Sequence, residues 1–214
     1  MTVSSEKTFP LPRPRLISNV SLEEALWNRR SRREFKPDPV SAEDVAQILW
    51  AAYGINQSGR GSISTAGKLK TAPSAGARYP LEIYLLAGNV MDMPTGFFKY
   101  IPGDHTIRLI NERNLGHELC VAALHQDMIL KAPACLVYTA IFRRTTSRYG
   151  ERGRTRYVPM DVGHSAQNVY LQATALNLGT CALGAFNDDQ VKKALDVPVE
   201  EEPLYLMPFG YYYS

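Results

Sequence analysis

Short apolar runs of strand length, set between segments with helical spacing, constrain most strongly what this chain can fold into. Apart from Glu82 and Thr139, residues 82–87 and 134–142 are apolar, which is typical of strands buried in a sheet. Residues 97–101 and 105–110 flank Pro102-Gly103-Asp104, a sequence that indicates a hairpin turn. Because hairpins and helical segments occur together in one chain, the pattern predicts an α+β fold with one main sheet.

Serine residues mark the starts of two predicted helices. Ser21 precedes a segment with helical spacing, and Glu24 three residues later completes a capping box. Ser41 opens a second predicted helix, which ends at Gly54. Further helices are predicted over residues 115–130, 161–178 and 188–195. The glycine-rich residues 54–80 predict a long loop, and loops of that length in compact domains are usually functional or disordered.

The composition fits one globular domain. The chain has 214 residues, of which 45% are apolar, with 24 Lys and Arg against 21 Asp and Glu. These values exclude disorder and collagen. Residues 1–20, in which prolines alternate with polar and basic residues, predict an extended N-terminal arm, and residues 21–214 predict the domain itself.

The net charge and the hydropathy of the chain limit the kinds of partner that it is expected to bind. The formal net charge of +3 is smaller than a protein dedicated to duplex nucleic acid usually carries, so we expect no nucleic-acid partner. No run of 18 apolar residues occurs, and the N-terminus lacks an apolar signal segment, so we expect no membrane partner and a cytoplasmic location.

Several common catalytic motifs are absent. The three cysteines, Cys120, Cys135 and Cys181, are far apart and have no histidine at metal-ligand spacing, so neither a disulfide framework nor a metal site is predicted. Gly59-Arg60-Gly61 lacks the third glycine of a dinucleotide-binding loop. No phosphate loop, H-E-x-x-H or G-x-S-x-G sequence is present, which removes support for ATPase, zinc-enzyme and hydrolase functions.

Basic residues are concentrated in two windows. Residues 29–36 contain five and residues 143–156 contain six of the 24 basic residues. The first window follows a predicted helix, and its adjacent guanidinium groups and hydroxyl suit the oxygens of a phosphate monoester. The alternative is a solvated basic helix end, which the helix dipole also favours.

Two segments of small residues are candidate ligand contacts. In residues 73–84, PSAGARYPLEIY, small side chains would let a flat ligand approach the backbone. In residues 179–186, GTCALGAF, two glycines bracket an apolar strand and would expose backbone N–H groups. A loop-to-strand turn and a buried strand with glycine ends are the respective alternatives.

Four segments of the chain, taken in order, together resemble the FMN-dependent nitroreductase family. These segments are NRRSRREF, TAPSAGARYPLEIYLL, RYGERGRTRYVPMDVGHSAQNVYLQATALNLGTCALGAFND and LYLMPFGY. The sequence is most similar to the branch of thiazole- and oxazole-forming peptide dehydrogenases, often called SagB-type. The resemblance implies an α+β nitroreductase-like fold, with a central, mostly antiparallel sheet flanked by helices. It also implies a homodimer with FMN at the subunit interface, which the N-terminal arm would embrace.

The resemblance assigns site residues in three groups. The FMN phosphate and ribityl chain would be held by Arg29, Arg30, Ser31 and Arg33. The isoalloxazine ring would lie against a segment of the partner chain that consists of Pro73, Ser74, Ala75 and Gly76. The flavin N5 and carbonyl edge would face the backbone of Leu183, Gly184 and Ala185, where an N–H group can stabilise the charge that develops on reduction.

The candidate catalytic residues are Tyr149 and Arg148. The peptide-dehydrogenase branch has a Lys-Tyr pair here, and because arginine stays protonated, Arg148 cannot act as a general base as lysine can. Tyr149 can donate a proton or orient a substrate, and Arg148 can bind an anionic one; a structural role for both is the alternative. Asp161 and His164 lie one helical turn apart, and we favour a structural role over an acid/base pair.

These residues imply an FMN-dependent oxidoreductase. The resemblance implies hydride transfer through flavin N5 from NAD(P)H or an organic donor to a nitroaromatic, quinone or related acceptor. An azoline dehydrogenase acting on a peptide, and a non-catalytic flavin-binding accessory protein, are the alternatives.

Overall fold

A seven-stranded sheet forms the centre of the protein, whose computed structural model describes residues 7–58 and 68–213. Across the sheet the strands are β1 (Thr8–Pro10), β6 (Thr106–Asn111), β5 (Gly96–Ile101), β4 (Leu81–Ala87), β7 (Ala134–Ala140), β9 (Glu202–Gly210) and β8 (Gly179–Thr180). Each neighbouring pair is antiparallel. The predicted hairpin at residues 102–104 joins β5 and β6. The predicted α+β fold with a mostly antiparallel central sheet is confirmed.

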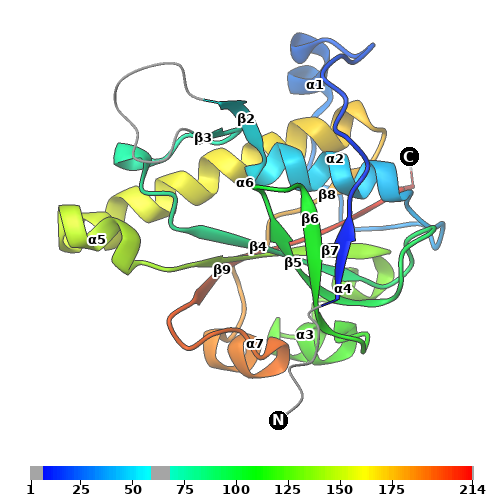
Figure 1. The fold of residues 1–214 in the computed structure, drawn as a ribbon. Coiled ribbons are helices and arrows are strands. Elements are labelled where there is room, and N and C mark those ends of the chain that lie inside the picture. The colour runs from blue at the N-terminus through cyan, green and yellow to red at the C-terminus, as the bar shows by residue number, and fades with distance from the viewer. Residues whose placement is uncertain (1–6, 59–67, 214) are drawn as a thin grey trace.

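Helices cover both faces of this sheet (Figure 1). On one face lie α2 (Ala42–Tyr53) and α6 (Val158–Ala175), and on the other lie α3 (Gly116–Ala122), α4 (Met128–Lys131) and α7 (Asp188–Leu195). The remaining helices are α1 (Leu22–Asn28), α5 (Arg143–Tyr149), a short 3-10 helix (Ala75–Ala77) and a π-helix (Gly153–Tyr157). Among the described residues, no helix is long and apolar enough to cross a membrane.

Alternate side chains of β4 enter two separate cores. Ile83 and Leu85 pack in the core beneath α2 and α6, whereas Tyr84 and Leu86 pack in the core beneath α3 and α7. Successive side chains of a strand point to opposite faces, so a strand covered on both sides needs an unbroken apolar run. This requirement explains why residues 82–87 lack the polar alternation of a half-exposed strand.

The predicted helix starts are confirmed at atomic detail. The Ser21 hydroxyl accepts a hydrogen bond from the Glu24 amide, and the Ser41 hydroxyl accepts one from the Asp44 amide. Each bond satisfies an amide that the first helical turn leaves without a partner. Gly54 follows the last residue of α2, as predicted.

The structure differs from the predicted elements in several places. The helix predicted over residues 161–178 spans Val158–Ala175. Residues 115–130 form two short helices instead of one, because Leu124 and His125 adopt positive φ angles of 58° and 60°, which a helix cannot contain. Residues 54–80 are not all loop, since β2 (Ile55–Ser58) and β3 (Lys68–Lys70) pair antiparallel. The Gly59-Arg60-Gly61 sequence lies outside the described residues.

The N-terminal segment is attached to the domain at several places, of which two fix its path. Its strand β1 pairs with β6. Further on, the buried Gln47 side chain of α2 accepts a hydrogen bond from the Arg15 amide at 2.7 Å and donates one to the Arg15 carbonyl at 3.1 Å. This pairing fixes the path of the arm over α2, while the division into an arm of residues 1–20 and a domain of residues 21–214 stays a prediction.

Candidate functional site

Arg29 and Ser31 lie around the phenol ring of Tyr170 in α6. The Arg29 guanidinium carbon is 5.4 Å from the centroid of that ring. The Ser31 hydroxyl shares a 3.2 Å hydrogen bond with the Tyr170 hydroxyl, and Ser31 also bridges Thr180 of β8. Both Arg29 and Ser31 retain surface exposure. A guanidinium and a hydroxyl in this arrangement provide donors for the oxygens of an anion such as phosphate.

The neighbouring arginines have different surroundings. The Arg30 guanidinium donates to the carbonyl oxygens of Trp27 and Arg29, at 3.0 and 2.8 Å, and so caps the end of α1. The Arg32 guanidinium carbon lies 4.4 Å from the centroid of the Tyr212 ring. Arg33 is exposed and forms no ion pair with a described carboxylate. The side chain of Arg30 is therefore engaged with the backbone, whereas that of Arg33 remains available to a ligand.

The segment after β8 brings backbone amides to the same place. The Ala182 amide donates to the Tyr170 hydroxyl at 2.8 Å, and Leu183 exchanges two backbone hydrogen bonds with Leu206 of β9. Gly184 and Ala185 are exposed, and their amides donate to no described residue. Tyr170 thus connects the first basic window to a stretch of backbone with free N–H groups, which can bind the electronegative edge of a ligand.

Asp161, in the first turn of α6, holds the small-residue segment. The Ser74 hydroxyl donates to one Asp161 carboxylate oxygen at 2.6 Å, and the Ala75 amide donates to the other at 3.3 Å. Burial raises the pKa of Asp161, and the two hydrogen bonds from this segment oppose that shift. His164 is exposed and makes no hydrogen bond to Asp161 within the described structure. Asp161 therefore acts as an anchor for a loop.

The Tyr149 hydroxyl lies directly over the backbone of Gly76. A Cβ atom at Gly76 would collide with this hydroxyl, and Gly76 has a φ angle of +58°. Both observations explain why a glycine occupies the position. Arg148 is exposed, and its guanidinium carbon is 5.5 Å from the centroid of the Tyr149 ring. The two predicted catalytic residues are therefore neighbours of the predicted segment Pro73–Gly76.

One protomer does not bring all three predicted groups together. The Arg29–Ser31 and Leu183–Ala185 groups meet at Tyr170, whereas the Pro73–Gly76 group meets Asp161. Nine helical residues separate the two contacts, which is about 13 Å along α6 at 1.5 Å per residue. The arrangement gives two partial sites at different positions along one helix.

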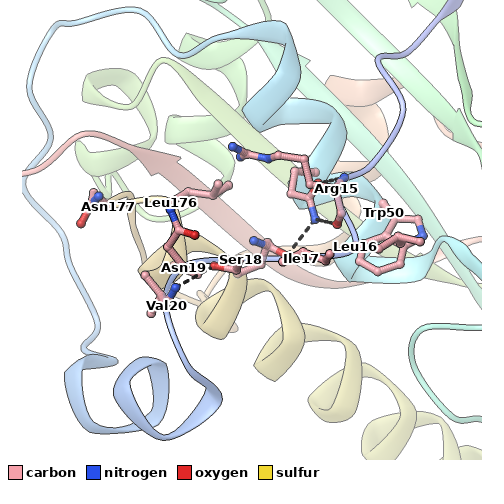
Figure 2. Close-up of a pocket in the computed structure, with 12 residues that line it drawn as sticks. Arg15, Leu16, Ile17, Ser18, Asn19, Val20, Trp50, Leu176 and Asn177 are labelled. Atoms are coloured by element: carbon pink, nitrogen blue, oxygen red, sulfur yellow. Dashed lines mark hydrogen bonds between the residues drawn. The ribbon is translucent and has the colours of Figure 1, made fainter.

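A separate hollow of about 530 Å³ lies between the N-terminal arm, Trp50 of α2 and the end of α6. Figure 2 shows the arm passing Trp50 on its way to Leu176 and Asn177. Leu16 and Ile17 are 80% and 87% exposed, although the preceding residue is fixed to α2. The hollow contains none of the predicted site residues, and its lining mixes polar and apolar side chains.

The comparisons with known proteins agree with this geometry. The sequence profile of the nitroreductase family matches residues 26–211. The chain belongs to the nitroreductase family. It is 47% identical over 194 residues to a nitroreductase homologue from Methanocaldococcus jannaschii, covering 91% of this chain and 92% of the homologue. The sequence resemblance is thereby confirmed, and the protein is an oxidoreductase of this family.

Two further relatives place the chain within the family. A nitroreductase-family crystal structure from Ralstonia eutropha superposes with a TM-score of 0.81 and 27% identity, covering 100% of this chain and 93% of that one. The microcin B17-processing protein McbC of Escherichia coli is 27% identical over 146 residues, which are 64% of this chain and 53% of McbC. The similarity to McbC supports the resemblance to the peptide-dehydrogenase branch.

Sequence analysis missed the connecting role of Tyr170. Tyr170 lies within the helix predicted over residues 161–178, and no local signal indicated contacts to residues 29, 31 and 182. The Tyr170–Ser31 contact joins residues 139 positions apart. Asp161 was identified only as one member of a possible acid/base pair, because its partner Ser74 is 87 positions away.

Proposed function

We propose that the protein is an FMN-dependent oxidoreductase whose two subunits each contribute residues to both flavin sites. Bound FMN would supply hydride chemistry at N5 that passes electrons from NAD(P)H or an organic donor to a nitroaromatic, quinone or related acceptor. The observation that carries this proposal is the contact of Tyr170 with both the first basic window and the segment of free amides. The basic residues on one side of Tyr170 suit a phosphate, and the free amides on the other side suit the edge of a polar ring.

The donor set fits FMN. The side chains of Arg29, Ser31 and Arg33 would bind the phosphate and ribityl chain. Arg30 would contribute its backbone to the same stretch of chain. The free amides of Gly184 and Ala185 would face the flavin ring, where an N–H donor stabilises negative charge. Leu183 would hold this segment in place through its pairing with β9.

The Pro73–Gly76 segment would serve the flavin site of the other subunit. Ser74 and Ala75 are fixed to Asp161, so the segment is ordered before a ligand binds. The Tyr149 hydroxyl over Gly76 would lie at the edge of that site, where it would donate a proton to a substrate or orient it. The segment is assigned to the partner's flavin because the family resemblance implies it, and the position of Asp161, about 13 Å along α6 from Tyr170, is compatible with that assignment.

The exposed side of α6 supports the two-fold arrangement. Its exposed residues follow helical spacing and form a stripe of Met160, Gly163, His164 and Gln167. Three of these residues lie between Asp161 and Tyr170 in the helix, and Met160 directly precedes Asp161. In a two-fold dimer with antiparallel α6 helices meeting there, the Pro73–Gly76 segment of each chain would approach the phosphate residues of the other.

Replacing Gly163 by arginine is expected to convert the dimer into a monomer of 23.9 kDa. A Cβ atom at Gly163 meets no atom within 4 Å in the protomer, so the substitution leaves the protomer fold intact while placing a long cation at the two-fold contact. Light scattering after size-exclusion chromatography measures the mass. The matched control is Gly163→Ala, which is expected to stay dimeric, and a dimeric G163R protein would contradict the assigned interface.

The visible absorption spectrum of the untreated protein tests the proposed cofactor. We expect a bound flavin whose absorbance bleaches on anaerobic addition of NADH or NADPH. Mass spectrometry of the released chromophore distinguishes FMN from other flavins. Absence of flavin after incubation with excess FMN would contradict the proposal. That result would favour an accessory protein that binds a partner without catalysing a reaction.

Azoline dehydrogenation of a peptide is the second candidate function, and the similarity to McbC favours it. Arg148 in place of lysine argues against it, because a guanidinium does not accept a proton from the azoline ring. The two candidates differ in the source of electrons. Flavin that bleaches with an azoline peptide but with neither NADH nor NADPH would select the peptide dehydrogenase.

A further inference from the structure

The arginines of the second basic window, residues 143–156, take no part in the proposed flavin contacts. Two of its arginines are paired, Arg144 with Glu82 of β4 and Arg154 with Glu202 of β9. The others are exposed and form no ion pair with any described carboxylate; they are Arg143, Arg148, Arg152 and Arg156. The window therefore presents uncompensated positive charge beside the segment that carries Gly76.

Two of these arginines are held on a pair of contacting tyrosines. The rings of Tyr149 and Tyr157 meet edge to face, with centroids 4.9 Å apart. The guanidinium carbon of Arg148 is 5.5 Å from the Tyr149 centroid, and that of Arg152 is 5.7 Å from the Tyr157 centroid. Arg152 Nε also donates to the Tyr157 hydroxyl at 2.9 Å. We name these four residues the Arg-Tyr cluster.

The local backbone explains how the cluster forms. Gly150 ends α5 with a φ angle of +56°, which turns the chain into the π-helix Gly153–Tyr157. Gly153 is buried, and a Cβ atom there would lie 3.2 Å from the Thr145 carbonyl carbon, so the two helices pack closely. The wider π-helical turn aligns residues five apart, which is the spacing of Arg152 and Tyr157. π-Helices are rare and frequently occur at functional sites.

We propose that the Arg-Tyr cluster binds the carboxylate of a small organic acid, and that the preferred electron acceptor of this enzyme is therefore an anionic one. Guanidinium groups bind carboxylates through paired charge-assisted hydrogen bonds, and the tyrosine rings provide a flat apolar surface for the rest of the ligand. The inference rests on the proposed function, because the Tyr149 hydroxyl over Gly76 connects the cluster to the proposed flavin site.

A solvated basic helix does not account for this arrangement. The guanidinium groups of Arg148 and Arg152 are placed on rings that touch each other, and Tyr149 and Tyr157 are only half-buried. Two cations on one small surface repel each other, and a bound anion relieves that repulsion. The structure provides carboxylate partners for Arg144 and Arg154 of this window, whereas Arg148 and Arg152, like Arg143 and Arg156, have none among the described residues; the two cluster arginines differ from Arg143 and Arg156 in lying against tyrosine rings.

Calorimetric titration with benzoate and benzamide tests the proposal without turnover. The two probes have the same shape, and only benzoate is charged. We expect the dimeric holoprotein to bind benzoate roughly tenfold more tightly than benzamide, which is ~1.4 kcal/mol. The double variant R148Q/R152Q is expected to lose this preference, and R148K, which keeps the charge, is expected to retain at least a threefold preference. The control R113Q removes a distant exposed charge and is expected to behave like the wild type.

Equal affinity for benzoate and benzamide in the wild type would overturn the proposal, as would an unchanged preference in R148Q/R152Q. Turnover supplies a second measurement with 4-nitrobenzoate and 4-nitrobenzamide, for which the ratio of kcat/KM is expected to fall roughly tenfold in the double variant. Failure of the proposed function gives a different result. In that case neither nitro compound is reduced and no flavin is bound, while the benzoate titration, repeated on the protein as purified, still reports on the cluster.

Discussion

Replacing Arg29 by alanine is expected to raise the dissociation constant of FMN by roughly ten- to hundredfold. The substitution removes a guanidinium group that would bind the phosphate through charge-assisted hydrogen bonds, and such bonds contribute about 1.5–3 kcal/mol each. The guanidinium also lies 5.4 Å from the Tyr170 ring centroid, so its loss weakens the packing that joins the phosphate and ring segments. Fluorescence titration of the flavin-free protein with FMN measures the change.

Two comparison variants separate binding from folding in this experiment. Arg113→Ala removes an exposed arginine that pairs with Glu118 far from the proposed site, and it is expected to leave the FMN affinity unchanged. Arg29→Lys keeps the charge but not the planar fork, so its FMN affinity is expected to be intermediate. A wild-type dissociation constant in the folded Arg29→Ala variant would remove Arg29 from the flavin site.

Local signals predicted the helix starts and the sheet, because both depend on nearby residues. The Ser21 and Ser41 caps each involve an amide three residues away, and the apolar run that follows Glu82, residues 83–87, reflects burial on both faces. A helix over residues 115–130 was wrongly predicted for the same reason. Its apolar spacing continues through Leu124 and His125, whereas their positive φ angles interrupt the helix.

The candidate site was predicted as three separate groups and not as an arrangement. Resemblance to a family supplied the residue assignments, but the contacts of Tyr170 and Asp161 depend on how α6 crosses the domain. Arg30 shows what the motif leaves open. It belongs to the same motif as Arg29, and its guanidinium donates to two carbonyl oxygens at the end of α1. The assignment of Arg29 and Arg30 to the phosphate stays a prediction, and sequence position alone does not reveal such backbone contacts.

Replacing Glu201 by alanine is expected to lower the free energy of unfolding by about 3–5 kcal/mol. Glu201 is 1% exposed and accepts hydrogen bonds from Tyr84 at 2.9 and 3.0 Å, from Thr139, and from Lys99 at 2.9 Å. Its loss leaves two buried hydroxyl groups without an acceptor and removes one of the two carboxylates that neutralise Lys99, the other being Glu82. The shift of the urea midpoint at unchanged slope measures the effect.

The physical reason for this loss is tested by removing the orphaned donors as well. In E201L/Y84F/T139V, apolar groups of similar shape replace the carboxylate and both hydroxyls, so more than half of the lost stability is expected to return. Glu112→Ala breaks an exposed ion pair with Lys7 and is expected to leave the urea midpoint nearly unchanged. If E201A cost no more than E112A, Glu201 would not be a structural anchor. If the triple variant were as unstable as E201A, lost charge neutralisation at Lys99 would account for the effect instead of unsatisfied hydroxyl groups.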